Sequence, residues 1–162
     1  MKKQILTILL LAITTIGYSQ RFGVGVQSSI YNPGLSAKFQ MNDYNAVQLV
    51  ASFLAYNYSD YSARYIRGFE EYNIGDVVTF QPYAVAMVSL QTFHYNSPII
   101  ADESGVGYGI GGGTSWKFSA VDKLEVTVEL AFRGTFVDYN SIYYTYWTPL
   151  LPVFGAHYFL GN

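Results

Sequence analysis

The stretch from Gly105 to Phe136, GVGYGIGGGTSWKFSAVDKLEVTVELAFRGTF, decides the fold. Its first half is rich in glycine, and the tetrapeptide Ala120-Val121-Asp122-Lys123 predicts a tight turn between two long strands. The second half alternates: one face carries Leu124, Val126, Val128, Leu130 and Phe132, and the other carries Glu125, Thr127, Glu129, Ala131 and Arg133. The rest of the chain must decide which face of this hairpin points inward.

The same two-residue rhythm runs through the remaining chain, and no helical periodicity of useful length follows residue 20. The predicted strands cover 21–31, 35–41, 47–54, 64–74, 81–95, 105–118, 124–133 and 153–160, with 64–74 the least regular. The segments 57–64, 96–104 and 138–149 are predicted as loops at one end of the molecule. The prolines lie in loops or at strand starts, where they remove no central ladder hydrogen bond. The pattern predicts eight antiparallel strands.

Residues 1–19 are typical of a secretory signal peptide. Lys2 and Lys3 precede an apolar run from Ile5 to Ile16, and Gly17-Tyr18-Ser19 supplies small residues at the cleavage positions. The apolar run is too short to span a bilayer. The expected mature domain therefore covers residues 20–162.

Composition narrows the class of protein further. Only 12% of the chain is charged, 18% is aromatic with sixteen Tyr, and Cys is absent. Soluble domains usually carry about 25% charged residues. Without Lys2 and Lys3, seven basic residues face eleven acidic ones, which excludes a nucleic-acid footprint. An exported, Tyr-rich chain with little charge and no helical span suggests a transmembrane β-barrel.

Two all-β architectures remain open at this point. A soluble lipocalin-like barrel would hold a lipid against an apolar interior, whereas a membrane barrel turns its apolar face to lipid and keeps a polar interior. The polar faces of the predicted strands carry small residues and scattered long polar ones, with too little charge for a water-exposed surface. Aromatic residues gather near strand ends, where membrane barrels place their girdles. The sequence favours the membrane barrel.

Several stretches resemble the small outer-membrane β-barrel family, the OmpA-like and porin-family barrel domains. They are the signal peptide, Gln81-Pro82-Tyr83 at a strand start, the glycine-rich strand, and Asp122-Lys123-Leu124-Glu125 leading into the alternating strand. The resemblance covers residues 20–162 and includes no peptidoglycan-binding domain. It implies an eight-stranded up-and-down transmembrane barrel in the outer membrane of a Gram-negative-type envelope. Outer-membrane lipids and the barrel assembly machinery would be its partners. Family members often end on an aromatic residue, whereas this chain places Tyr158 and Phe159 before Leu160-Gly161-Asn162.

Charged residues on the predicted inner faces form one candidate site. Glu125, Glu129 and Arg133 repeat every fourth residue of one strand, and Lys117 is predicted opposite Glu125 across the hairpin. Lys38, Lys117 and Arg133 could neutralise the two glutamates, because charges in a confined interior are tolerated when paired or hydrated. Two interpretations stay open: a structural set of ion pairs, or a narrow ion channel lined by Lys38, Lys117, Glu125, Glu129 and Arg133.

Tyrosine-rich segments form a second candidate site. Tyr and Trp favour lipid–water interfaces and also anchor protein contacts. The residues predicted to serve loop recognition are Tyr61, Arg64, Arg67, Tyr143, Tyr144 and Trp147. The two arginines could also contact anionic lipid head groups.

Catalysis, cofactors and metals find little support. Gly107, Gly109 and Gly112 match a dinucleotide fingerprint by letter, but they lie inside a predicted strand instead of a strand-to-helix turn. His94 and His157 are the only histidines, and neither has a nucleophile and an acid suitably spaced on its own strand. The sequence therefore predicts a non-enzymatic barrel with a structural or surface-interaction role. The channel and the soluble lipid-binding barrel are its alternatives.

Overall fold

The computed structural model describes residues 21–29, 32–54, 58–94, 102–139 and 142–160. These residues form strands joined by short turns. The strands are β1 (Arg21–Ser29), β2 (Asn32–Asn42), β3 (Asn45–Leu54), β4 (Tyr58–Gly68), β5 (Tyr72–Ile74), β6 (Val78–Phe93), β7 (Glu103–Phe118), β8 (Val121–Tyr139) and β9 (Ile142–Leu160). No helix in the described ranges is long and apolar enough to cross a membrane.

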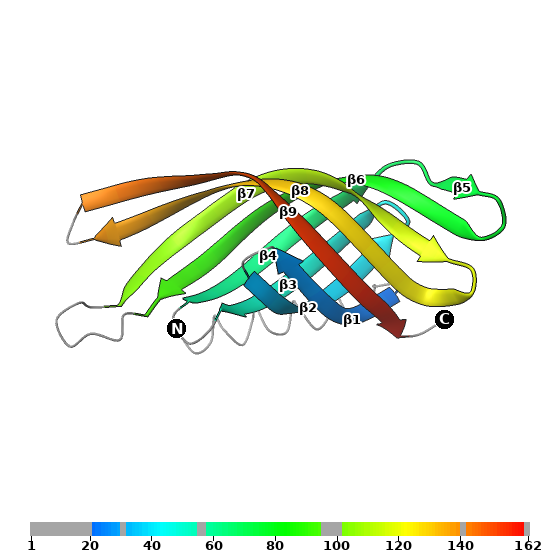
Figure 1. Cartoon of the computed structure of the whole chain (residues 1–162), viewed down its shortest axis with the longest axis horizontal. Coiled ribbons are helices and arrows are strands. Elements are labelled where there is room, and N and C mark those ends of the chain that lie inside the picture. Colours follow the sequence, from blue (N-terminus) through cyan, green and yellow to red (C-terminus); the bar gives the residue numbers. More distant parts are fainter. Residues whose placement is uncertain (1–20, 30–31, 55–57, 95–101, 140–141, 161–162) are drawn as a thin grey trace.

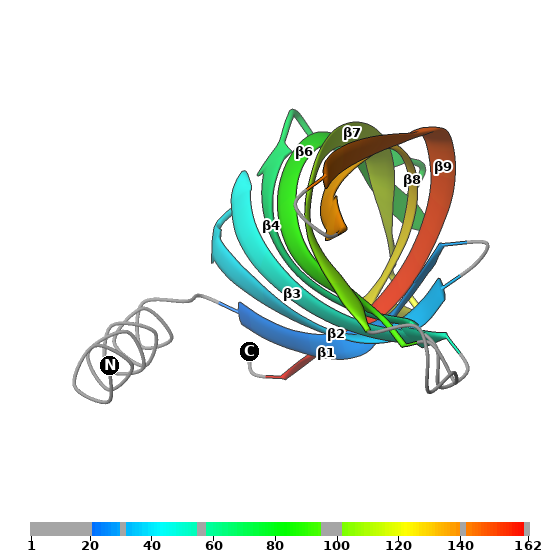
Figure 2. The same cartoon turned by 90° about the vertical axis from the view of Figure 1, so that its left-hand side faces the viewer.

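Eight of these strands close into an antiparallel barrel. Each pairs with its neighbour along the chain, β1 pairs with β9, and β4 pairs with β6. The short β5 pairs only with β6, at Tyr72↔Phe80 to Ile74↔Val78, and stands outside the ring. Viewed end-on, the strands form one closed ring (Figure 2). The predicted eight-stranded, all-β, up-and-down barrel is therefore confirmed.

The barrel has a turn end and a loop end. At the turn end lie Arg21 and Leu160, the β2–β3 turn at Asp43-Tyr44 and the β7–β8 turn at Ser119-Ala120 (Figure 1). The β6–β7 and β8–β9 connections lie at the loop end. The predicted turn at Ala120-Val121-Asp122-Lys123 is thus slightly displaced, because β8 already begins at Val121. Lys117 does pair in register with Glu125, as predicted.

The strands are strongly tilted. Starting at Gly23, successive paired residues run through Lys38, Gln48, Arg64, Met87, Gly109 and Arg133 to Thr148. Gly23 itself pairs with Phe159, so the circuit closes with an offset of about eleven residues, as tilted barrel strands require. Inward side chains of one row therefore climb the lumen as a spiral, and Lys38 lies at a different level from Arg133.

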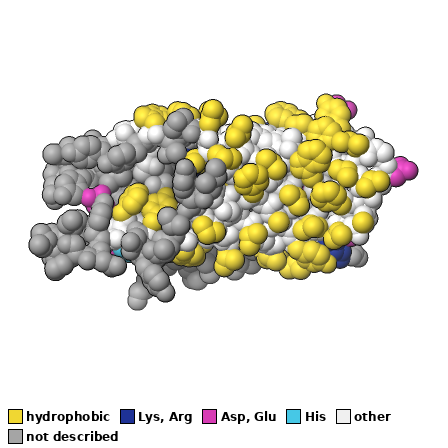
Figure 3. All heavy atoms as spheres, in the orientation of Figure 1, with side chains coloured by type: hydrophobic (Ala, Val, Ile, Leu, Met, Phe, Trp, Pro, Cys, Tyr) yellow, Lys and Arg dark blue, Asp and Glu magenta, His cyan; other side chains and the backbone are white. Residues whose placement is uncertain are grey.

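The faces of the β7–β8 hairpin settle the orientation. Val128, Leu130 and Phe132 are 41%, 53% and 40% exposed, whereas Glu125 and Glu129 are 3% and 2% exposed. Apolar side chains also spread over the outer surface, and charged ones appear near the ends (Figure 3). The apolar face of the alternating strand points out of the barrel and its charged face points in.

Two sequence-based assignments are wrong. The segment 57–64 is no loop, because β4 is a regular strand from Tyr58 to Gly68. Its alternation was hard to recognise because Asp60 and Arg64 are the inward residues and Tyr61 and Tyr65 the outward ones. Likewise, most of the predicted loop 138–149 continues the β8–β9 ladder to Tyr139↔Ile142. In the predicted loop 96–104, residues 96–101 lie outside the described ranges, and β7 already begins at Glu103.

Candidate functional site

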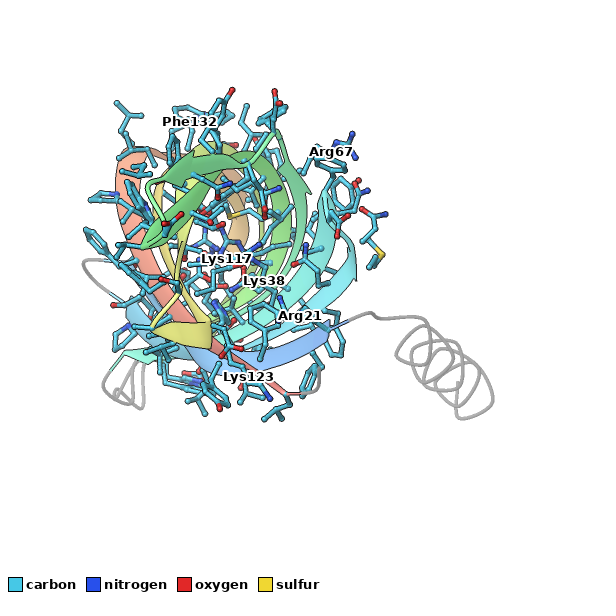
Figure 4. All side chains as sticks on the ribbon, turned by 90° about the vertical axis from the view of Figure 1, so that its right-hand side faces the viewer. Arg21, Lys38, Arg67, Lys117, Lys123 and Phe132 are labelled. Carbon is cyan, nitrogen blue, oxygen red and sulfur yellow. The ribbon has the colours of Figure 1, made fainter. Side chains whose placement is uncertain are left out.

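The lumen contains a compact set of buried charged and polar side chains. Lys38, Gln48, Arg64, Glu125, Glu129 and His157 are each at most 4% exposed. They come from β2, β3, β4, β8 and β9, and we call these six residues the plug. Lys38 points into the lumen, whereas Phe132 and Arg67 point outward (Figure 4).

Two ion pairs hold the plug together. Lys38 Nζ donates to Glu125 Oε1. Arg64 Nη2 lies 2.5 Å from both carboxylate oxygens of Glu129, and its Nη1 donates to Gln48 Oε1 at 3.0 Å. The Tyr83 hydroxyl also donates to Glu129 Oε2 at 3.0 Å. Each buried carboxylate therefore has a cationic partner, as burial of charge requires.

Neutral polar groups fill the space between the ion pairs. Gln48 Nε2 donates to Ser36 Oγ at 2.7 Å and also bonds to Gln27 Oε1. His157 Nε2 lies 2.8 Å from Ser36 Oγ and 3.0 Å from Gln48 Nε2. Hydrogen bonds thus join Glu129, Arg64, Gln48, Ser36 and His157 into one network, and the Lys38–Glu125 pair lies in the lumen as a separate pair.

A second charged layer lies closer to the loop end. Arg133 Nη2 donates to Asp60 Oδ2 at 2.7 Å and contacts Ser89 Oγ at 3.3 Å. The Tyr58 hydroxyl donates to the same Asp60 oxygen at 3.2 Å. Asp60 is 2% exposed. The interior therefore holds two levels of Arg–carboxylate pairing.

Two cavities lie in the lumen, on opposite sides of the plug. The loop-end cavity measures about 40 Å³, and Asn32, Asp60, Arg64, Glu129 and Arg133 are among its lining residues. The turn-end cavity measures about 230 Å³ and is lined by Arg21, Gln40, Asp43, Glu71, Lys117, Asp122, Leu124, Glu125 and Phe159. The two share no lining residue. The plug separates them, so neither cavity runs through the barrel.

The predicted interior charges separate into three places. Lys38 and Glu125 meet each other, Glu129 meets Arg64, and Arg133 meets Asp60. Lys117 lies at the turn end, where its Nζ is 2.6 Å from Glu71 Oε1. Glu125 thus pairs across the lumen with Lys38, although Lys117 is its neighbour in the ladder. The structure brings four of the five residues into the lumen proper and leaves Lys117 at the rim.

The predicted recognition residues do not form one loop surface. Arg64 is the clearest correction, since it is 4% exposed inside the barrel. Arg67 is exposed near the turn end, where Nη1 donates to Asn45 Oδ1 at 3.0 Å and the guanidinium lies 5.5 Å from the Tyr44 ring centroid. Tyr61 is half-exposed on the outer face of β4.

The remaining recognition residues belong to β9. Trp147 is 53% exposed and packs against Tyr108 and Phe132, with ring centroids 5.6 and 5.2 Å away. Tyr143 and Tyr144 are strand residues paired with Asp138 and Val137, and their side chains lie outside the described part of the structure. These residues occupy the outer wall and an extended hairpin.

Sequence reasoning missed Asp60, Arg64, Gln48, Ser36 and Tyr83 as parts of the interior network. The available signal was the alternation of Asp60, Ser62 and Arg64 with Tyr61, Ala63 and Tyr65. In this strand the alternation is visible in the polar residues and not in the apolar ones, and the polar residues are the ones that face inward. The pairing of Glu129 with Arg64 depends on closure of the barrel, so no local sequence pattern predicts it.

The Ser36–His157 contact resembles the nucleophile–base pair of a hydrolase. However, His157 Nδ1 has no hydrogen-bond partner in the described structure, so no carboxylate orients the ring. Both residues are buried, at 7% and 1% exposure. Among the described residues, no three His, Cys, Asp or Glu gather to hold a metal ion. The site has the chemistry of a structural network.

Lys and Arg are concentrated in the lumen and toward the turn end of the barrel. After residue 20 the chain has seven Lys and Arg, and the segments outside the described ranges contain none of them. Lys38, Arg64 and Arg133 lie in the lumen, and the four others, Arg21, Arg67, Lys117 and Lys123, lie toward the turn end (Figure 4). Asp102 and Glu103 stand at the loop end, before and at the start of β7. The loop end carries no Lys or Arg, and its histidine, His94, lies with Nδ1 2.8 Å from Asp102 Oδ2.

No protein-family model matches the chain, and a search of curated proteins finds no match. Among solved structures, the chain is similar to the N-terminal β-barrel domain of OprF from Pseudomonas aeruginosa. The TM-score is 0.61 at 14% identity, over 86% of this chain and 96% of that one. It also matches Ail, the attachment invasion locus protein of Yersinia pestis, with a TM-score of 0.35 at 10% identity over 86% and 94% of the two chains. The second likeness is too distant to carry an argument.

The closed eight-stranded barrel, its polar plug and its apolar outer wall define the class. The protein has the fold of the small OmpA-like outer-membrane β-barrels. At 14% identity, the likeness to the OprF domain establishes this fold and nothing finer.

Proposed function

We propose that this protein is a small outer-membrane barrel with a structural or surface-interaction role and no enzymatic chemistry. Export by the N-terminal signal, assembly by the barrel assembly machinery and surrounding outer-membrane lipids belong to the same proposal. The observation that carries it is the inverted distribution of polarity. Large apolar side chains are exposed, such as Leu35 and Ile110 at 67% each, while Lys38 and Glu129 are 3% and 2% exposed. In water this arrangement would leave an extensive apolar surface unpartnered.

The protruding β8–β9 hairpin supports a surface-interaction role. β9 pairs with β1 only from Val153 to Leu160, whereas its pairing with β8 continues to Ile142. In Figure 1 this hairpin extends beyond the short strands β1–β4 at the loop end. The outer edge of 142–152 therefore has no partner strand in the described structure, and such an edge can accept an extended peptide. Pro149 and Pro152 interrupt its donors near the barrel rim.

The plug argues against the ion-channel alternative. A conducting path would have to join the two lumen cavities through a layer in which every member is at most 4% exposed. Eight-stranded barrels also leave room for little more than side chains. A soluble lipid-binding barrel is disfavoured because its interior would be apolar, whereas this lumen is lined by ion pairs.

The proposal is tested by a charge placed on the outer wall. Leu130→Arg puts a cation at a position 53% exposed on β8, and Val77→Arg puts one at a position 64% exposed in the turn before β6. In a bilayer, Leu130→Arg should cost about 2–4 kcal/mol of folding free energy, because a lipid-facing charge at depth is unfavourable. Val77→Arg should fold like the parent, because it lies beyond the apolar band. The measurement is urea-dependent folding into phospholipid vesicles.

Equal behaviour of the two variants would contradict the membrane placement. Recovery of folded parent protein from the soluble periplasmic fraction, without detergent, would independently contradict the membrane placement. It would favour the alternative of a soluble lipid-binding barrel.

A further inference from the structure

The outer wall over β2, β3 and β4 is hollowed into a shallow apolar groove of about 520 Å³. Each alanine of the groove pairs with a leucine or a tyrosine on a neighbouring strand, so short side chains lie between long ones. The long side chains, Leu35, Leu49 and Tyr61, are 67%, 49% and 50% exposed and form the sides of the groove. The outward side chains that line it are Leu35, Ala37, Leu49, Ala51, Tyr61 and Ala63.

A fixed cation lies on the same face of β4, nearer the turn end. The outward row of this strand continues from Tyr61 and Ala63 through Tyr65 to Arg67, which points away from the barrel (Figure 4). Arg67 Nη1 and the Tyr65 hydroxyl both donate to Asn45 Oδ1, at 3.0 and 2.5 Å, and the guanidinium lies 5.5 Å from the Tyr44 ring centroid. These contacts orient the guanidinium and use few of its five donors.

Arg67 also keeps its charge available. Within the described ranges, the five ion pairs involve other residues, so no carboxylate neutralises this guanidinium. A planar, oriented guanidinium matches the geometry of a phosphate group. The other turn-end cations differ in position: Arg21 and Lys117 line the turn-end cavity, and Lys123 lies on β8, which does not line the groove.

The distance between cation and groove fits one leaflet of a bilayer. From Tyr61 to Arg67 the strand advances six residues, which is roughly 20 Å at ~3.3 Å per residue. A barrel strand tilted by about 40° converts this length into roughly 15 Å of depth. That depth is half of the ~30 Å hydrocarbon core of a bilayer. When Arg67 lies at the level of the head groups, the groove therefore lies near the bilayer midplane, where acyl chains end.

We propose that one phospholipid of the leaflet at the turn end binds this surface, with its phosphate on Arg67 and one acyl chain in the groove. Arg67 supplies the charge that complements the phosphate, and the groove supplies the apolar surface that complements the chain. The inference rests on the proposed membrane placement and adds a defined lipid site to it.

Native mass spectrometry tests the proposal, using the refolded mature protein released from detergent micelles after titration with phosphatidylglycerol. The parent barrel should retain one lipid molecule. Arg67→Gln should weaken retention about tenfold, because a charge-assisted contact to the phosphate is lost. Diacylglycerol with the same acyl chains and inorganic phosphate each supply only one part of the ligand, so both should bind more weakly than phosphatidylglycerol.

Filling the groove gives an independent readout. Ala51→Leu occupies space in the groove and should weaken retention several-fold without changing the charge, and Ala63→Leu does the same should the first variant not fold. Ala156→Leu is the matched control, because it makes the same substitution on β9, outside the groove, and should bind like the parent. Lys123→Gln is the control for Arg67, because it removes a turn-end cation on β8.

Retention at the parent's level by Arg67→Gln, or by both groove-filling variants, would overturn the lipid site. Equal retention of diacylglycerol and phosphatidylglycerol would also overturn it, because the phosphate would then contribute nothing. A parent protein that folds into phospholipid vesicles but retains no lipid overturns this site and leaves the proposed membrane placement standing. A parent protein that does not fold into vesicles overturns both.

Discussion

Glu129 shows how a single residue fits a charge into the lumen. Its carboxylate oxygens both accept from Arg64 Nη2, one of them also accepts from the Tyr83 hydroxyl, and the residue is 2% exposed. Such a pair stabilises little compared with apolar packing, yet loss of one partner is severe, because the other charge stays buried and unpaired. Lys117 and Glu71 form a pair of similar length at the rim, where their side chains are 31% and 41% exposed.

These two pairs make a matched comparison. Glu129→Gln should lower the free energy of unfolding by about 3–5 kcal/mol, because it leaves Arg64 charged in the lumen. Glu71→Gln should cost less than about 1 kcal/mol, because solvent screens the rim pair. Urea titration of the refolded proteins in vesicles measures both. Similar losses for the two variants would show that the plug is no more desolvated than the rim.

For individual residues, the sequence predicted which charged side chains face inward better than it predicted their ion-pair partners. Strand alternation places Lys38, Glu125, Glu129 and Arg133 on inward faces. Their partners depend on the tilt and closure of the barrel, which bring β4 opposite β8 and β2 opposite β8 across the lumen. The spacing of residues along one strand does not predict which side chains meet across the lumen. The choice of Lys38 over Lys117 by Glu125 is therefore a property of the closed barrel.

At the scale of elements, the glycine-rich β7 is shaped by its neighbours. A Cβ at Gly111 would lie 2.7 Å from the Leu130 carbonyl oxygen and 3.1 Å from Val85 Cγ1. At the adjacent Gly112 it would meet only the Tyr83 carbonyl oxygen, at 3.4 Å. The two glycines face opposite sides of the same strand, so only one of them is needed for close packing.

Substitution by alanine should separate these two glycines. Gly111→Ala should destabilise the barrel by about 1–3 kcal/mol, as overpacking does. Gly112→Ala should be close to neutral, because its Cβ enters ordinary contact distance. The fraction of heat-resistant, compact barrel on cold gel electrophoresis, followed by urea midpoints, reads out the difference. A Gly112→Ala loss as large as that of Gly111→Ala would contradict this account of β7.

Element prediction succeeded where apolar residues define the alternation and failed where tyrosine does. The strict pattern of Leu124 to Arg133 predicts the right face, whereas the sequence predicts loops at the Tyr-rich segments 57–64 and 138–149, where the structure has strands from Tyr58 and up to Tyr139 and from Ile142. Tyrosine is common both in strands at the lipid–water interface and in loops, so its presence does not distinguish a strand from a loop. The ladder of β8 and β9 up to Tyr139↔Ile142 had to come from the structure.

For the molecule as a whole, the plug separates the loop-end cavity from the turn-end cavity in the described part of the lumen. Closure through β1–β9 and β4–β6 brings the plug residues of five strands together inside the lumen. The sequence predicted the barrel and its polar interior, but the division of the lumen follows from the spiral of inward rows. A blocked lumen predicts that the barrel conducts no ions, and this can be measured.

The parent protein should show no discrete conductance steps in planar bilayers. Arg64→Ser combined with Glu129→Ser should introduce small steps, because the double change shortens two plug side chains and removes both charges. Lys117→Ser combined with Glu71→Ser is the control and should stay silent, since that pair lies at the rim. Steps in the parent protein at neutral pH would instead favour the ion-channel alternative.

The uneven placement of Lys and Arg bears on the direction in which the proposed membrane barrel would insert. A lipid-exposed Lys or Arg at mid-depth costs ~2–4 kcal/mol, so each such residue on a leading edge raises the barrier to crossing. No Lys or Arg lies at the loop end, whereas Arg21, Arg67, Lys117 and Lys123 lie toward the turn end. The three other cations are already neutralised inside the lumen. In the proposed membrane placement, insertion with the turn end leading would carry these four residues across the apolar layer, whereas insertion with the loop end leading would carry none of the four.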